Sequence, residues 1–449
     1  MKAYEPSGHS PWNVQRVVHL HRRAGFAATW QEIQRDLDDG PDAAIDRLLA
    51  GKAYATGVPE DFDTMSRVIG DAAVAANNPN RLKAWWLYRM IFSPDPLTER
   101  LTLMWHNHFA TSNLKVGDVS VMRRQNEIFR ECARKPFGEL LTRVVKDPAI
   151  LIWLDADSNR KQHPNENLAR ELMELFSMGV GNYTENDVKQ AARGLTGWTT
   201  KNGQFRFVEQ YHDNGEKEFL GKRGTFTGDD LLQTVLDHPA TARRIAWRLC
   251  DQFFGEGALG EEAIDEFATE LRNHDLDIRR AVETILRSEA FFAAKNIGTR
   301  VLGPIEFVVG AVRALEMLDP PPSTLVLSEW TARLGQDLFY PPNVFGWSGG
   351  REWITTRSMI GRVAFASELA RGSLRRPDKP VDVAKLSKYV DGDSTHEALA
   401  EFATSLLVPV SSKEFRQRIC DSVFAKEDTG DLTCRMFEAI LASPEAQLG

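Results

Sequence analysis

The stretch "PNENLARELMELFSMG", residues 164–179, has the clearest helical pattern in the chain and decides the fold class. Leu168, Leu172 and Leu175 recur at intervals of three to four residues, so they share one face of an α-helix, and Gly179 is suited to its exit. A short turn leads to a second helical pattern, "TENDVKQAARGL". Helices with apolar stripes bury those stripes against one another, which predicts a protein built mainly of packed helices.

Helical periodicity continues on both sides of this stretch, for example in "RLKAWWLYRMIF", "LTERLTLMWHNHF", "PATARRIAWRLCDQFF" and "GPIEFVVGAVRALEML". The only good β-signal is "QFRFVEQYHDNGEKEFLG", residues 204–221, where Phe205 and Phe207 suggest an extended arm and "DNG" suggests a turn before a second arm. We therefore expect a mainly α protein, a multi-helix globular bundle with one small β-hairpin near residues 204–221 and a long ordered loop.

The expected loop is "FYPPNVFGWSGGREWITTR", residues 339–357. Loops of this length are uncommon in compact domains and are frequently functional. Trp347 and Trp353 can stack on a ligand, or they can plug the loop onto the helices beneath it. Both interpretations remain open, and we take these tryptophans and Asn343 as candidate ligand contacts.

The length of 449 residues allows more than one structural unit. The best linker signal is "RGSLRRPDKP", residues 371–380. We expect a main helical domain over residues 1–372 and a small C-terminal helical appendage over residues 381–449.

Composition excludes several classes of protein. The net charge of -8, with no basic stripe, argues against a nucleic-acid partner. The four cysteines form no C-x-x-C pair, which fits a reducing compartment. Neither a signal peptide nor a membrane span is visible, so the expected location is cytoplasmic. Common cofactor motifs are also absent, which leaves the cofactor and any metal unknown.

The segment "WHNHF", residues 105–109, places two histidines two positions apart, as a metal site can. On a helix such residues point about 200° apart, so both cannot bind one ion unless the helix has ended. We expect a helix through about His106, with Trp105 and Phe109 in the core and the two imidazoles facing different neighbours. The histidines are then structural, or at least one, with His108 favoured, belongs to a metal or catalytic site.

Glu171 falls beside the apolar stripe of its helix, where a carboxylate needs a partner or has a raised pKa. It is a candidate catalytic residue, with Arg170 or Arg193 as its expected neighbour. In the alternative interpretation the charges of this segment, including Glu166, Arg170 and Glu174, are an ordinary ladder on a helix surface.

Two further groups are candidates. His212 has no role in the turn that Asp213 is suited to form, which makes it a candidate catalytic residue. His19 and Arg22, together with Arg23, can bind an anion, although arginines near a helix C-terminus are also favourable for dipole reasons alone.

The order of five motifs resembles the bacterial family called domain of unknown function 1800, over nearly the whole chain. The motifs are "HLHRRAGF", "LTERLTLMWHNHFATS", "NENLARELMELFSMGVGNYTENDVKQAARGLTGW", "YHDNGEKEFLG...FTGDD" and "LGQDLFYPPNVFGWSGGREWI". The resemblance implies no settled activity, but it suggests that the protein has a partner from a sulfatase-like family. His19 occupies the usual histidine position of the first motif, whereas His21 replaces an aliphatic residue and is expected to be peripheral.

Two functions compete. The first is a hydrolytic or metal-assisted enzyme whose pocket gathers His19, His106, His108, Glu171, His212 and the tryptophan loop, because these polar residues stand in apolar motifs. The second is a non-catalytic helical scaffold or chaperone-like partner, because the same tryptophans and arginines suit an interface.

Overall fold

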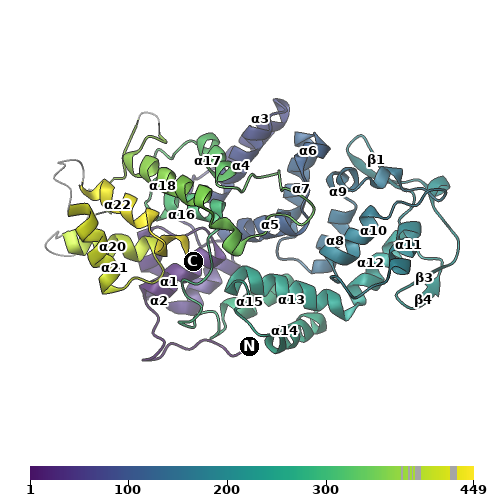
Figure 1. The fold of residues 1–449 in the computed structure, drawn as a ribbon, viewed down its shortest axis with the longest axis horizontal. Helices are drawn as coiled ribbons and strands as arrows, with labels where there is room; N and C mark the ends of the chain where they lie inside the picture. The colour runs from purple at the N-terminus through teal and green to yellow at the C-terminus, as the bar shows by residue number, and fades with distance from the viewer. Residues whose placement is uncertain (376–377, 383–384, 387, 390–395, 425–431) are drawn as a thin grey trace.

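The computed structural model describes residues 1–375, 378–382, 385–386, 388–389, 396–424 and 432–449 (Figure 1). The described part is mainly α-helical, with two small two-stranded sheets, which confirms the expected fold class. It is elongated, with α8 to α12 at one end and α20 to α22 at the other (Figure 1).

The first half of the chain contains α1 (Val14–Ala24), α2 (Trp30–Leu49), α3 (Phe62–Ala75), α4 (Pro79–Phe92), α5 (Pro96–His108), α6 (Asn113–Val116), α7 (Val119–Glu131), α8 (Phe137–Val145), α9 (Pro148–Trp153), α10 (Asn167–Glu171) and α11 (Glu185–Gly194). The second half contains α12 (Gly228–Asp237), α13 (Pro239–Phe254), α14 (Glu261–Asn273), α15 (Ile278–Leu286), α16 (Pro304–Ala314), α17 (Thr324–Arg333), α18 (Thr356–Arg371), α20 (His396–Leu407), α21 (Lys413–Phe424) and α22 (Leu432–Ala442).

The buried apolar side chains form two clusters, and α5 contributes to both. Leu101 and Trp105 belong to the cluster that also receives α8 to α15. Leu103 belongs to the other, which receives α3, α4 and most of α16 to α22. Helix α5 therefore lies between the two halves of the core, which places its polar side chains at the junction.

The stretch 164–179 is helical over residues 167–176, and the second part of this helix, Leu172–Phe176, is a π-helical turn. The hydroxyl of Ser177 donates to the carbonyl of Leu172, and the imidazole of His108 bonds the carbonyl of Phe176. These side chains satisfy carbonyl groups that the helix end leaves without an intrahelical partner.

The strand expectation needs a correction. Strand β2 (Gln204–Phe207) pairs backward with β1 (Trp198–Lys201), and β3 (Lys217–Phe219) pairs with β4 (Lys222–Gly224). Asn202 and Gly203, both with positive φ, form the tight turn of the first hairpin. In the "DNG" segment the carboxylate of Asp213 accepts from the N–H of Gly215, and the segment joins the two sheets instead of two arms of one hairpin.

Helix α22 packs on α18, and α20 contacts α1 and α16. The division into units at residues 1–372 and 381–449 stays a prediction, and residues 376–377 of the expected linker lie outside the described residues. Between α17 and α18 the chain contains only a short 3₁₀ turn, Gly350–Trp353. No described helix combines the length and the apolar run that a membrane crossing needs.

Candidate functional site

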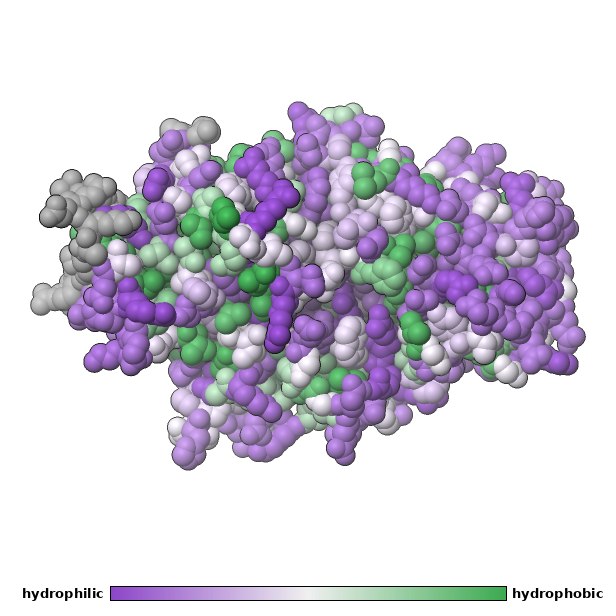
Figure 2. All heavy atoms as spheres, in the orientation of Figure 1, coloured by the Kyte–Doolittle hydropathy of each residue, from purple (hydrophilic) through white to green (hydrophobic). Residues whose placement is uncertain are grey.

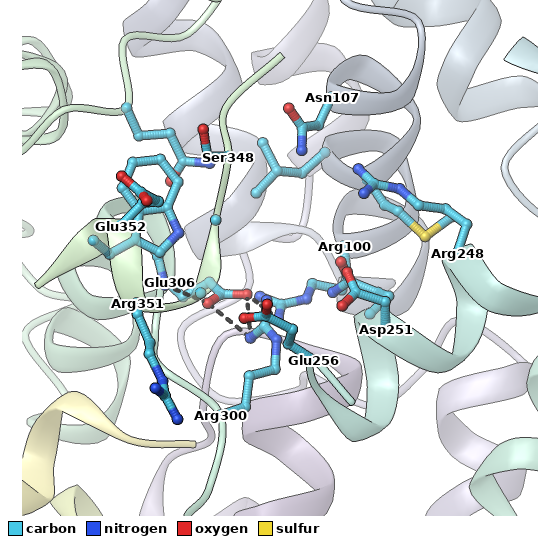
Figure 3. A pocket seen from close by; sticks show the side chains of 18 of the residues that line it. Arg100, Asn107, Arg248, Asp251, Glu256, Arg300, Glu306, Ser348, Arg351 and Glu352 are labelled. Atoms are coloured by element: carbon cyan, nitrogen blue, oxygen red, sulfur yellow. Dashed lines mark hydrogen bonds and ion pairs between the residues drawn. The ribbon is translucent and has the colours of Figure 1, made fainter. Parts of the chain in front are cut away.

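A cavity of about 530 Å³ lies where α5 and α13 meet the N-terminus of α16 (Figure 3). We call it the central cavity. Its wall opposite α13 is part of the 339–357 loop, residues 348–353. Its polar lining comprises Arg100, Asn107, Arg248, Asp251, Gln252, Glu256, Arg300, Glu306, Gln336, Ser348, Arg351, Glu352 and Trp353.

Glu306 is the buried carboxylate in the floor of the central cavity. It forms ion pairs with Arg100 and Arg300, the latter at 2.9 Å, and accepts a hydrogen bond of 2.6 Å from the backbone N–H of Gly303. Burial opposes the charged form, but the two guanidinium groups outweigh it and lower the pKa of Glu306. The carboxylate therefore stays ionised and caps the first turn of α16.

Arg100 is 1% exposed and lies across the floor from α5. The amide oxygen of Gln252, turned toward it, accepts from its Nε at 2.7 Å. Its Nη1 has no hydrogen-bond partner among the described residues. Burial lowers the pKa of Arg100 to about 10, with Glu306 working in the opposite direction. The group remains charged at neutral pH and keeps a free donor.

Helix α13 brings Arg248 and Asp251 into the central cavity, and Glu256 follows just after the helix (Figure 3). Within the described part of the chain, none of these three side chains forms a hydrogen bond or an ion pair. Burial lowers the pKa of Arg248, and the charge of Asp251 raises it. Three charged groups are thus available on one side of the cavity.

His106 and His108 face different neighbours, as expected from their spacing. His106 is surrounded by the rings of Trp86, Phe129, Phe339 and Trp347, while the Nε2 of His108 lies 3.0 Å from the carbonyl oxygen of Phe176. Burial lowers the pKa of each to about 3. Both imidazoles are therefore neutral and packed, and neither lines the central cavity.

Because His106 and His108 have different surroundings, replacement of each by leucine should have a different effect on stability. Neither ring nitrogen of His106 has a partner in the described structure, so His106→Leu should leave the free energy of unfolding within about 1 kcal/mol or raise it. His108→Leu should lower it by about 1–3 kcal/mol, because the carbonyl of Phe176 loses its donor. Urea unfolding of both variants measures the difference. Equal losses would show that the hydrogen bond of His108 is not the cause.

The charged residues that the sequence placed near Glu171 are paired with other residues. Arg170 pairs with Glu166 and Glu185, and Arg193 with Asp213, so neither makes an ion pair with Glu171. Glu171 is half-buried, and burial, with a contribution from Glu174, raises its pKa.

His212 is buried, and its Nδ1 lies 2.9 Å from the carbonyl oxygen of Thr196. No hydrogen bond or ion pair in the described part of the chain joins His108, Glu171 and His212. Their catalytic roles stay predictions.

Three polar side chains of α1 form hydrogen bonds with segments that are distant in the sequence. His19 bonds the carbonyl of Phe291, and Arg22 donates to the carbonyls of Leu407 and Leu448. His21, expected to be peripheral, is fully buried and lies 2.7 Å from a carboxylate oxygen of Asp36. The polar groups of this helix are therefore used to join distant segments.

The 339–357 loop is divided between packing and the cavity. Trp347 is buried over His106, and its backbone N–H donates to the side chain of Asn107 at 2.7 Å. Asn343 is exposed and accepts from the N–H of Phe345. Trp353 lines the central cavity and is the one candidate ligand contact from the sequence that the structure places there.

Comparison with known families adds one result. The sequence profile described as "Protein of unknown function (DUF1800)" matches residues 19–448. The chain belongs to the DUF1800 family. The comparisons found no matching curated protein and no matching solved structure. The resemblance found from the motifs is thereby confirmed.

In this DUF1800 protein, sequence reasoning missed most of the cavity lining. A usable signal was Glu306, a lone carboxylate inside the apolar run "GPIEFVVGAV". Arg248 and Asp251 gave none, because charges spaced along an amphipathic helix look like a solvated face. Glu256, just after that helix, gave none either. Within the described residues, no group of three or more His, Cys, Asp or Glu side chains could hold a metal ion.

Proposed function

We propose that the central cavity is the active site of a hydrolase acting on a small polar substrate. The observation that carries this proposal is the set of Arg248, Asp251 and Glu256, which line the cavity without hydrogen bonds or ion pairs in the described part of the chain. Arg248 and Asp251 are half-buried, whereas Glu256 is exposed, and charges withdrawn from water are usually paired in folded proteins. Charges that stay unpaired in a cavity are available to a ligand.

The chemistry follows from the types of group. Asp251 accepts a proton from a water molecule, whose oxygen attacks an electrophilic carbonyl or phosphoryl centre. The bond to the leaving group then breaks, and the leaving group takes that proton from Asp251. Arg100 and Arg248 stabilise the negative charge that develops on the attacked group. Glu256, on the exposed side of the cavity, orients donor groups of the substrate.

The test is an assay of purified protein against p-nitrophenyl esters, phosphates and glycosides. We expect turnover of at least one class, and Asp251→Asn should lower kcat by about a hundredfold or more. The matched control is Asp265→Asn on α14, which removes an exposed carboxylate paired with Arg243 and should leave the rate unchanged. Turnover of no class, or an unaffected rate in Asp251→Asn, would contradict the proposal.

The second candidate is a non-catalytic scaffold that binds a sulfatase-like protein. Its support is the pair Phe345 and Ile360, apolar side chains that are each 67% exposed. Figure 2 shows one face of the molecule as polar side chains interspersed with small apolar patches. This function would be favoured if a sulfatase-like protein co-purifies with the wild type and does not co-purify with the double variant Phe345→Ser, Ile360→Ser. The cytoplasmic location and the absence of nucleic-acid binding stay predictions.

A further inference from the structure

Several arginines surround the single carboxylate of Glu306 in the floor of the central cavity. Glu306 is the carboxylate that faces a group of five arginines: Arg22, Arg23, Arg100, Arg300 and Arg362. Arg100 and Arg23 also repel Arg300, which contributes to their lowered pKa values. One carboxylate cannot neutralise five guanidinium groups, so the immediate surroundings of Glu306 carry excess positive charge. Asp251, Glu256 and Glu352 line the same cavity and balance the charge of the rest of its lining.

Three of these arginines do not line the cavity and are bonded to groups outside it. Arg22 and Arg23 donate to backbone carbonyls, and Arg362 donates to Gln447 and to the carbonyl of Leu302. They contribute charge to the floor without being able to turn toward a ligand.

The donors that remain belong to the cavity itself. Arg100 keeps Nη1 without a partner among the described residues, and it is 1% exposed. Arg248, in the wall above, makes no hydrogen bond or ion pair within the same residues. Two guanidinium groups from different helices thus border the same space (Figure 3).

We propose that the ligand of the central cavity carries a phosphoryl group, which binds to Arg100 and Arg248. This inference rests on the proposed function, because it takes the same cavity as the substrate site. A dianion offsets the excess positive charge better than a carboxylate does, and its oxygens suit the fork of donors that a guanidinium presents. Asp251, on the same helix as Arg248, then lies beside the phosphoryl group as the proposed base, and Glu256 faces the remainder of the substrate.

Isothermal titration calorimetry with the full chain tests this inference with three probes: inorganic phosphate, phenyl phosphate and acetate. We expect both phosphates to bind and acetate to bind at least about tenfold more weakly. Tighter binding of phenyl phosphate than of inorganic phosphate would assign the site to a phosphate ester, and the reverse order would assign it to the free ion. Binding should weaken as ionic strength rises.

The matched variants are Arg248→Met and Arg244→Met, one turn apart on α13. Arg244 lies over the ring of Trp247 and does not line the cavity. Arg248→Met should weaken phosphate binding by about tenfold or more, and Arg244→Met should leave it unchanged. Glu256→Gln, at an exposed position, should instead tighten binding, because it removes a like charge near the anion.

The outcomes separate this inference from the hydrolase proposal. Phosphate binding that depends on Arg248, in a protein that hydrolyses none of the test substrates, supports the inference and contradicts the proposed reaction. Turnover of an ester or glycoside without phosphate binding overturns the inference alone. Equal effects of Arg244→Met and Arg248→Met, or acetate binding as tightly as phosphate, also overturn it.

Discussion

The free energy of unfolding should fall steeply between about pH 6.5 and pH 4.5, by roughly 3 kcal/mol per pH unit. Burial lowers the pKa of His106 and His108 to about 3 and that of His19 well below its usual range. Below about pH 6.5 the unfolded chain protonates these imidazoles and the native protein does not, so the unfolded state binds more protons. Stability is therefore lost as the pH falls.

Asp147 changes the free energy of unfolding in the opposite direction, and the predicted slope includes its contribution. Burial raises the pKa of Asp147 to about 7, so the native protein binds a proton there that the unfolded chain releases above about pH 3.8. The three histidines together contribute about 4 kcal/mol per pH unit, and Asp147 offsets about 1.4 kcal/mol of it.

Urea titrations at about pH 6.5, 5.5 and 4.5 measure this slope. The variant His106→Leu removes one of the three imidazoles and should reduce the slope by about 1.4 kcal/mol per pH unit. A protein equally stable at the three pH values would contradict the neutral, buried state of these histidines.

Glu306→Gln should lower the free energy of unfolding by about 3–5 kcal/mol. Glutamine retains the shape and can still accept from the N–H of Gly303, but it removes the charge that compensates Arg100 and Arg300. The guanidinium groups would then be buried beside one another without a counter-charge. Urea unfolding at neutral pH measures the loss.

The matched control is Glu329→Gln, which removes a carboxylate from an exposed pair with Arg333 and should change stability by less than about 0.5 kcal/mol. If Glu306→Gln does not fold, the double variant Glu306→Gln with Arg300→Met should recover folded protein, because it removes one uncompensated charge. A single variant within about 1 kcal/mol of the wild type would show that Glu306 is not the stabilising counter-charge.

The sequence predicted the helices well because their apolar residues follow the helical period. The stretch 164–179 and the "WHNHF" segment are examples: Leu168, Leu172, Trp105 and Phe109 are all buried. The spacing also predicted that His106 and His108 diverge, since that result depends only on the geometry of one helix. The pairing of β2 was predicted wrongly, because Asn202 and Gly203 form as good a turn as the "DNG" that follows.

The sequence by itself determined the mainly helical class, the position of most helices and the family. Only the tertiary structure decided the candidate site. Arg100 and Glu306 are 206 positions apart and meet because α5 and the start of α16 pack at the junction of the two core clusters. Helical periodicity is a local property, whereas the pairing of charges depends on how distant helices cross. A charged residue that lines a cavity therefore has the same sequence pattern as one that faces solvent.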